Sequence, residues 1–219
     1  MTLSLTPDEL LSTTRAVRRR LDFDRPLDMK LVYECLQLAI QAPTGANRQG
    51  WHFMLVTDPQ KKLAVAELYR KGWDSYIGSS RAKIPPEEKP VVEQSHDERV
   101  VSSSDYLAKN MHRAPVLLIP CISGRISGAG KNLAFRQASH FGSILPAAWS
   151  FMLAARVRGL GACWTTLHLI YEEEAADVLG IPYESITQAG MIPVAHTLGT
   201  SFRPAPRKPL DDLVHINQW

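Results

Sequence analysis

One polar stretch in the N-terminal third of the chain combines hydrogen-bonding side chains with turn residues. Residues 42–53 read Ala-Pro-Thr-Gly-Ala-Asn-Arg-Gln-Gly-Trp-His-Phe. Thr44, Asn47 and Gln49 supply hydroxyl and amide groups that both donate and accept hydrogen bonds, and Pro43 and Gly45 are turn formers. A purely structural turn rarely needs all three polar groups. The stretch therefore predicts a loop that contacts a planar polar ligand, and an ordinary helix-to-strand connection is the alternative.

Arginines form a second group with possible binding chemistry. Arg15, Arg18 and Arg19 concentrate positive charge close to the first predicted helix. Arginine suits phosphate because its planar guanidinium donates two parallel hydrogen bonds. Arg207 and Lys208 form another basic pair near the other end of the chain. Charge alone favours a solvated basic turn at 15–19, and the sequence does not show whether the two groups meet.

Several familiar site patterns are absent from the sequence. Gly124, Gly128 and Gly130 have the wrong spacing for the dinucleotide-binding pattern G-x-G-x-x-G, and no P-loop, serine-hydrolase or zinc-protease motif occurs. The seven histidines are dispersed. We therefore expect no metal site and no acid–base pair made of side chains.

Composition indicates one soluble globular domain over residues 1–219. The chain is 45% hydrophobic and 21% charged, with a formal net charge of +3, so it can bury a core and gives no global signal for nucleic acid. Its three cysteines are far apart and favour a reducing cytoplasm over disulfides. Acidic residues and arginines interrupt the N-terminus, so no secretory signal is expected there. The longest apolar stretch, 144–155, contains Pro146 and is too short to span a membrane.

The chain alternates helical and strand patterns in the order α-α-β-α-lid-α-β-α-β-α-β, which predicts an α+β fold. Capping residues predict helix starts at Thr6, Asp28 and Asp58. Residues 116–122 form a continuous apolar run that suits a buried central strand, and Gly180 closes a helix over 171–179. A long apolar helix is expected over 132–158, with a kink or restart at Pro146. The remaining strands are expected at 52–57, from residue 162 and within 186–198.

Two segments do not fit the regular pattern. Residues 72–104 are rich in Gly, Ser, Pro and charge, and we expect a loop-rich insertion that acts as a lid, with a disordered excursion as the alternative. Residues 203–219 are rich in proline and end in alternating apolar residues. This C-terminal arm is expected to pack on a partner subunit.

In this order the motifs resemble the flavin-dependent nitroreductase family. That family typically has Arg-Arg-Ser-x-Arg after its first helix, Ala-Pro-Ser-x-x-Asn-x-Gln-Pro-Trp-x-Phe before its first strand, Gly-Leu-Gly after a long central helix, a Leu-Gly-Ile-Pro turn and a late Arg-Lys-Pro-Leu segment. The corresponding segments here lie at 14–18, 42–53, 159–164, 179–182 and 207–210. The resemblance covers about residues 10 to 212, and it is the order and spacing of the motifs that is specific.

The resemblance implies an intertwined homodimer, with a central, mostly antiparallel sheet flanked by helices and two FMN sites at the subunit interface. Arg15, Arg18 and Arg207 match positions that hold the FMN phosphate and ribityl chain, and Arg19 is a neighbouring candidate. Pro43, Thr44, Gly45, Asn47 and Gln49 match the loop that reaches the flavin from the partner subunit. Trp164, Thr165, Thr166 and Leu167 match the segment that passes the flavin ring.

The sequence departs from the family pattern in two places, the phosphate site and the polar loop. The first Arg and the Ser of the family pattern are Thr14 and Ala16 here, so Arg19 or Arg203 is expected to rebuild part of it. The Pro after the Gln is Gly50, which loosens the loop.

The resemblance also implies the chemistry. We expect an FMN oxidoreductase in which NADPH or NADH gives a hydride to the flavin and a nitroaromatic, quinone or similar small acceptor then takes two electrons, in a ping-pong sequence. Arg18 is the candidate for stabilising the charge on the flavin's N1–O2 edge. No side chain is expected to carry the chemistry itself, because the cofactor does so. The alternatives are a flavin storage protein whose lid closes the site, a related reaction such as reductive dehalogenation, and a plain interaction module.

Overall fold

The computed structural model describes residues 2–79, 91–126, 128 and 130–219. Its helices are α1 (Pro7–Thr13), α2 (Met29–Ala39), α3 (Pro59–Gly78), α4 (Val91–Asn110), α5 (Leu133–Gly142), α6 (Leu145–Val157) and α7 (Glu172–Leu179). Its strands are β1 (Leu21–Asp22), β2 (Trp51–Val56), β3 (Val116–Ser123), β4 (Leu160–Ala162), β5 (Ile186–Gln188) and β6 (Ile192–Thr197). Short 3₁₀ turns are η1 (Gly45–Asn47), η4 (Met111–Arg113), η5 (Leu167–Tyr171) and η6 (Leu210–Asp212).

The described strands form one six-stranded sheet in the order β1-β6-β3-β2, with β4 paired to β6 and β5 to β3. Every strand pair is antiparallel, and Phe53 lies opposite Pro120 at the centre of the β2–β3 pair. Seven of the eight residues of β3 are buried, as expected for a strand covered on both faces. The predicted α+β class and mostly antiparallel sheet are confirmed.

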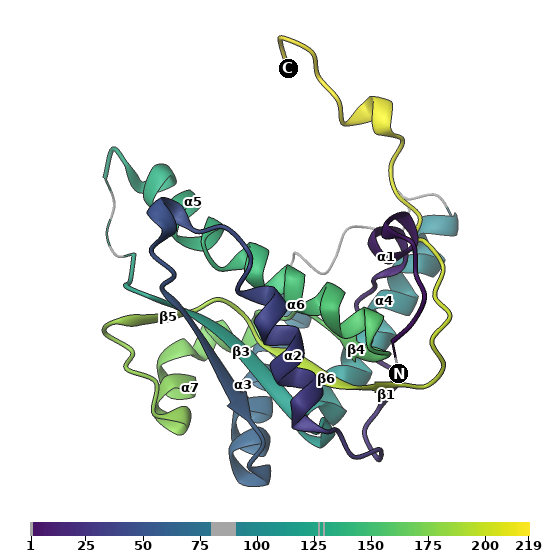
Figure 1. The fold of residues 1–219 in the computed structure, drawn as a ribbon, viewed down its shortest axis with the longest axis horizontal. Helices are drawn as coiled ribbons and strands as arrows, with labels where there is room; N and C mark the ends of the chain where they lie inside the picture. The colour runs from purple at the N-terminus through teal and green to yellow at the C-terminus, as the bar shows by residue number, and fades with distance from the viewer. Residues whose placement is uncertain (1, 80–90, 127, 129) are drawn as a thin grey trace.

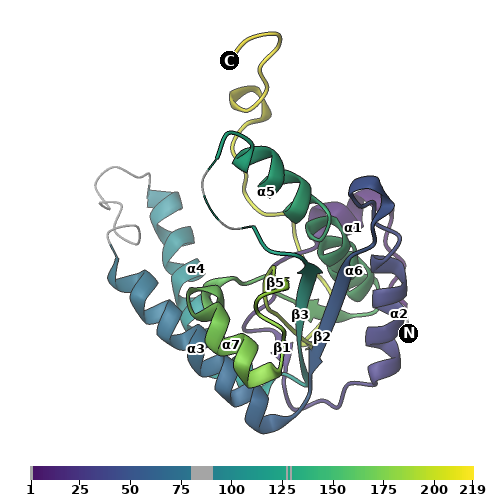
Figure 2. The same ribbon diagram turned by 90° about the vertical axis from the view of Figure 1, so that its left-hand side faces the viewer.

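Helices cover both faces of this sheet and divide the core in two. On one face α2 and α6 pack around Val32, Phe151 and Ile192. On the other, α3, α4 and α7 pack around Tyr69, Leu107 and Met191. Figure 2 shows the two groups of helices on opposite sides of β2 and β3.

Local sequence signals account for most of the helix ends. Thr6 forms the predicted capping box with Glu9, and the Asp28 and Asp58 side chains accept hydrogen bonds from the first turns of α2 and α3. The expected long helix over 132–158 is two helices, α5 and α6, and Pro146 sits in the first turn of the second. The restart at Pro146 is therefore confirmed.

The loop-rich expectation for residues 72–104 is wrong for most of that segment. Helix α3 continues to Gly78 and helix α4 begins at Val91, while 80–90 lie outside the described residues. The polar composition misled because α3, and α4 over residues 98–110, bury only a minority of their side chains and leave many polar ones exposed. The role of this segment as a lid stays a prediction.

A glycine in α3 fixes the approach of this helix to the segment that follows β4. A Cβ atom on Gly72 would lie 2.4 Å from the carbonyl oxygen of Leu167, in η5. Real Cβ atoms do not come this close to backbone, so any larger residue must push α3 and η5 apart. Gly72 thus sets the position of the residues next to Leu167.

We expect Gly72→Ala to lower the free energy of unfolding by about 2 kcal/mol. The steric clash with Leu167 should destabilise the fold by more than the higher helix propensity of alanine stabilises α3. Gly78→Ala, in the last turn of the same helix, is the control, since nothing lies within 4 Å of its Cβ position. Urea denaturation of both variants measures this. Equal stability of the two would show that α3 can shift freely.

Candidate functional site

Three of the predicted arginines line one cavity of about 890 Å³ between the segment after α1 and helix α4. We call it the basic pocket. Its lining residues are Arg15, Ala16, Arg18, Arg19, Glu98, Arg99, Val100, Ser102, Ser103 and Pro206. The pocket therefore holds four arginines against one glutamate, which is a strongly electropositive cavity suited to an anionic ligand.

Neutral oxygen atoms hold these arginines in place. Arg15 donates to the carbonyl oxygen of Arg203 at 2.8 Å. Arg19 donates to the carbonyl and the hydroxyl of Ser102 at 3.2 and 2.8 Å, and Arg18 makes a long contact of 3.5 Å with the hydroxyl of Ser103. None of these partners is an acid, so the positive charge of the three guanidinium groups stays available to a ligand.

Arg20 has a different role from its neighbours. Its guanidinium donates to the carbonyl oxygens of Leu198, Gly199 and Ser201 at 2.8 to 2.9 Å. It also lies over the Phe202 ring, 4.0 Å from the centroid. Arg20 thus anchors the start of the C-terminal arm and directs it back toward the basic pocket.

Residues 164–167 lie beside the arginine segment because the two backbones are bridged just before them. Ala16 pairs with Ala162, and the Val17 N–H donates to the Ala162 carbonyl at 2.9 Å. Thr165 then pairs with Met191 through two backbone hydrogen bonds and one from its hydroxyl at 2.6 Å. Trp164 and Leu167 are partly exposed and Thr166 is exposed, so this segment presents backbone and side-chain surface next to the pocket.

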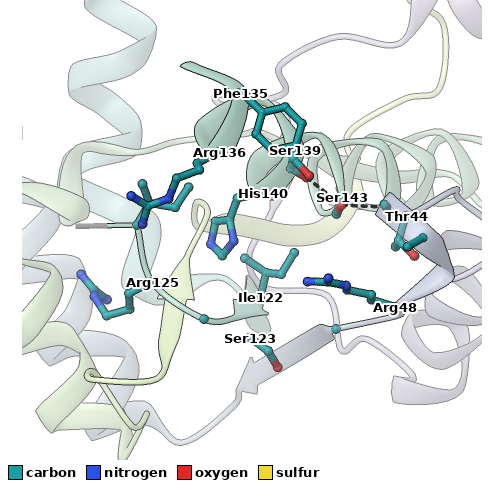
Figure 3. Close-up of a pocket in the computed structure, with 15 residues that line it drawn as sticks. Thr44, Arg48, Ile122, Ser123, Arg125, Phe135, Arg136, Ser139, His140 and Ser143 are labelled. Carbon is teal, nitrogen blue, oxygen red and sulfur yellow. Dashed lines mark hydrogen bonds between the residues drawn. The ribbon is translucent and has the colours of Figure 1, made fainter. Parts of the chain in front are cut away.

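The polar loop at 43–49 lines a different cavity, shown in Figure 3, of about 780 Å³. Thr44 and Gly45 contribute to it, with Arg48. The loop is docked on the C-terminal end of α5 through the Gly45 N–H, which donates to the hydroxyl of the capping residue Ser143 at 3.0 Å. Within the loop, the Gln49 N–H donates to the Thr44 hydroxyl. Figure 3 shows Arg48 and His140 pointing toward the space between the loop and α5.

The loop is also conformationally strained. Ala46, Asn47 and Gln49 all have φ near +50°, a region that L-residues enter at a cost. The Gln49 amide donates to the Asn47 side-chain oxygen at 3.0 Å. Three strained positions among the four residues 46–49, in a loop docked on α5, are typical of a loop shaped for contact with a ligand or partner.

The structure does not bring all the predicted residues together within one chain. The arginine segment is anchored at the Arg156 end of α6, where Arg156 donates to the Thr13 hydroxyl. The loop is anchored at Ser143, just before that helix begins. A rise of 1.5 Å per residue places about 20 Å of helix between these anchors, and Figure 1 shows α1 and the loop at opposite ends of the α5–α6 pair.

The last predicted residue, Arg207, lies in the exposed arm and donates only to the neighbouring Pro206 carbonyl. Because the preceding residue, Pro206, lines the basic pocket, the backbone of Arg207 lies at the edge of this pocket. Beyond it, the arm leaves the body of the protein, as Figure 1 shows. Its apolar side chains are left exposed: Leu210, Leu213, Val214, Ile216 and Trp219.

Sequence reasoning missed the contribution of α4 to the basic pocket. Arg99, Ser102 and Ser103 line it, and their i, i+3, i+4 spacing places them on one helix face. That spacing was available in the sequence but was hidden by the expectation of a loop. Glu98 also lines the pocket, and no motif marked it.

Arg125, in the cavity beside the loop, is neutralised within the chain. It forms an ion pair of 2.8 Å with Glu172 and lies over the Tyr183 ring at 3.9 Å. Its pKa is raised chiefly by the hydrogen bond with Glu172. An anion at Arg125 would therefore have to displace a carboxylate.

The predicted absence of disulfides agrees with three free, buried cysteines. Burial raises the pKa of Cys35 to about 11 and that of Cys121 to about 12, so both stay as thiols. Among the described residues no group of His, Cys, Asp and Glu could hold a metal ion. No helix in the same part of the chain is long and apolar enough to cross a membrane.

Comparisons with known proteins place these features in a family. The sequence model of the Nitroreductase family matches residues 11–196. A curated relative from Bacillus subtilis (strain 168), "Putative NAD(P)H nitroreductase YodC", is 24% identical over 149 residues, which is 68% of this chain and 70% of the relative.

Solved structures share the fold over nearly the whole chain. A BluB-like flavoprotein from Clostridium difficile 630 has a TM-score of 0.69 at 17% identity, covering 98% of this chain and 100% of its own. Iodotyrosine deiodinase bound to FMN and 3-iodo-L-tyrosine has 0.68 at 18%, covering 97% and 98%. The FMN and NADPH-dependent nitroreductase NfnB from Sphigopyxis sp. strain HMH has 0.64 at 21%, covering 98% and 100%.

A buried histidine directly follows the 164–167 segment. His168 is fully buried, and neither ring nitrogen has a hydrogen-bond partner of acceptable geometry. Burial lowers the pKa of His168 to about 4, and the nearby Glu172 and Gln188 side chains only partly oppose this. The ring is therefore neutral in the folded protein at pH 7.

His168 makes the protein sensitive to acid. Because its pKa is lower in the folded than in the unfolded state, the unfolded chain binds the proton first, and stability falls as the pH drops from about 6.5 toward 4. Lowering the pH from 7.5 to 5 should reduce the free energy of unfolding of both proteins. We expect this reduction to be about 2 kcal/mol smaller in His168→Leu than in the wild type. Urea denaturation at both pH values measures this, and equal losses would contradict it.

Proposed function

The chain belongs to the nitroreductase family, and we propose that it is an FMN-dependent oxidoreductase that uses NADPH or NADH to reduce electron-poor small molecules such as nitroaromatics or quinones. The observation that carries this proposal is the basic pocket, with its uncompensated arginines beside the backbone of residues 164–167. A ligand that combines a phosphate with a polar aromatic ring needs positive charge for the phosphate and, next to it, backbone hydrogen-bonding groups for the ring.

The residues present fit FMN. A cavity of about 890 Å³ lies within the usual range for ligand sites. Arg15 and Arg207 would hold the phosphate, because Arg15 lines the pocket and donates to Arg203 of the arm, and Arg207 directly follows Pro206, which also lines it. Arg18 would supply positive charge to the polar edge of the ring, and residues 164–167 would lie along it.

Bound FMN would supply the hydride chemistry. The chain would then have only to bind and orient the reactants and exclude water. Arg18 is in contact with the buried Cys163, whose pKa is raised by burial. That thiol stays neutral and leaves the charge of Arg18 for the cofactor. The two-step order, donor before acceptor, is part of the proposal.

We propose that the working protein is a homodimer in which the loop of one subunit completes the basic pocket of the other. Within one chain about 20 Å of helix separates the two anchors, so the loop cannot reach its own pocket. A second copy related by a two-fold axis would supply the loop. The contact between loop and pocket would then occur twice in the dimer, once for each site.

Exposed apolar side chains support such an interface. Tyr33 on α2, Ile40 at the end of α2, and Leu145 and Trp149 on α6 are each 40% exposed or more. They lie on the helix layer that also holds the loop. The apolar arm would cover part of the same partner, which would explain its extension away from its own body.

The absorption spectrum tests the proposed reaction first. We expect the purified or FMN-reconstituted protein to show a flavin spectrum that bleaches without oxygen on addition of NADPH or NADH, and that returns on addition of a nitroaromatic or quinone. A spectrum that persists with both donors would indicate flavin storage. A protein that cannot take up FMN would contradict the proposal.

Mixed dimers test the shared site. We expect a pocket variant, R15Q/R18Q, and a loop variant, N47G/Q49G, each to lose flavin and activity, because each removes one half of every site. Co-expressed, they should recover about a quarter of wild-type activity, since half of the dimers would hold one intact site of two.

Glycine at the loop positions keeps the positive φ accessible, so the loop variant removes only the amides. Ala46→Gly is the matched control, because it relaxes the strain without removing a polar group, and it should keep its flavin. A co-expressed mixture no more active than either variant alone would show that each chain builds its own site.

A further inference from the structure

The basic pocket holds more positive charge than FMN needs, and the excess lies on its α4 side. We propose that Arg99 and Arg19 form a second anion subsite there, which takes a phosphate or carboxylate of the molecule that reacts with the bound cofactor. The inference rests on the proposed function. It adds the chemical class of the reacting partner, a molecule with an anionic group, and the residues that select it.

Helix α4 presents a continuous polar face to the pocket. Arg99, Ser102, Ser103 and Tyr106 follow one another at i, i+3, i+4 and i+7, so they share one side of the helix. The first three line the basic pocket. Val100 of α4 also lines the pocket, but the face that carries Arg99, Ser102 and Ser103 presents a cation and two hydroxyl groups, which suit an anion.

Arg19 is fixed against this face before any ligand binds. One of its terminal nitrogens, Nη2, makes both bonds to Ser102, and the guanidinium lies 5.2 Å from the centroid of the Tyr106 ring. Nε and the other terminal nitrogen, Nη1, keep their N–H groups for a ligand. A guanidinium held in this way loses little further freedom when an anion binds, which favours affinity.

Arg99 stands at the same face with its charge uncompensated. Among the described residues its exposed side chain makes no hydrogen bond or ion pair. Ser102 and Ser103 lie one turn further along α4, and they bind Arg19 and Arg18 respectively. Arg99 therefore lies one helical turn from Ser103, the residue that contacts Arg18, toward the N-terminal end of α4.

The charge balance separates this subsite from the cofactor. A phosphate monoester carries at most two negative charges, and Arg15 with Arg207 already matches these. Arg18 is assigned to the ring edge. Arg19 and Arg99 then remain as two positive charges, against the single carboxylate of Glu98. A further anion would neutralise the excess, and the reacting molecule is the one that must enter beside the bound cofactor.

The test compares how variants choose between charged and neutral partners. For the donor, NADPH is compared with NADH, which differ by one phosphate. For the acceptor, 4-nitrobenzoate is compared with 4-nitrobenzyl alcohol. For each pair, the measured ratio is kcat/KM for the molecule with the additional negative charge divided by kcat/KM for the other. We expect Arg99→Gln and Arg19→Gln to lower one of these two ratios about tenfold, which is the effect of one charge-assisted hydrogen bond. Arg99→Lys should restore part of the loss, and added salt should lower the wild-type ratio.

Lys109→Gln is the matched control, since it removes one positive charge from the same helix and Lys109, which pairs with Asp105, does not line the pocket. A fall in the donor ratio would assign the subsite to the ribose phosphate of NADPH. A fall in the acceptor ratio would assign it to an acidic acceptor. Two unchanged ratios, in variants that still bind and reduce FMN, would overturn this inference alone.

Failure of the wild-type protein to bind FMN would instead overturn the proposed function, and this inference with it. The visible spectrum of each variant, recorded before kinetics, separates the two cases.

Discussion

The proposed site depends on the short backbone bridge between Ala16 and Ala162. This bridge joins a segment close to the N-terminus to the end of β4, and so places the arginines beside residues 164–167. The bridge requires a glycine next to it, because a Cβ on Gly161 would lie 2.8 to 3.0 Å from the side chains of Thr197, Leu21 and Val17. The packing of β1, β4 and β6 around Gly161 is thus what allows residues 15–19 and residues 164–167, the two segments proposed to bind FMN, to adjoin.

Helix α6 imposes the opposite constraint on the polar loop. Its core side is apolar and buried, so the helix is a rigid spacer that holds the loop and the arginines at its two ends. A site that needs both can form only between two copies of the chain. On the proposed arrangement, the same apolar helix layer that prevents closure within one chain also provides the surface on which the second copy packs.

The sequence predicted the elements whose signals are local. Capping residues, the apolar run of β3 and the Pro146 restart all depend on a few neighbouring residues, and each was found. It failed where a tertiary contact decides the outcome. Helix α4 buries only a narrow side, so its composition resembles a loop, and β1 has two residues and exists because β6 pairs with it. The role of Arg20 as an anchor of the arm depends on carbonyl groups some 180 residues away.

Site residues divide in the same way. The type of each arginine was visible in the sequence, but its function depends on what neutralises it. Arg125 is matched by a carboxylate and belongs to the framework. Among the described residues, Arg18 and Arg19 donate hydrogen bonds to serine oxygens and form no ion pair with a carboxylate, so their geometry is fixed without cancelling their charge. Holding several like charges in one pocket disfavours the empty protein through their mutual repulsion, and an anionic ligand relieves it. On the proposed function, an anionic ligand that binds the folded protein would therefore also stabilise it against unfolding.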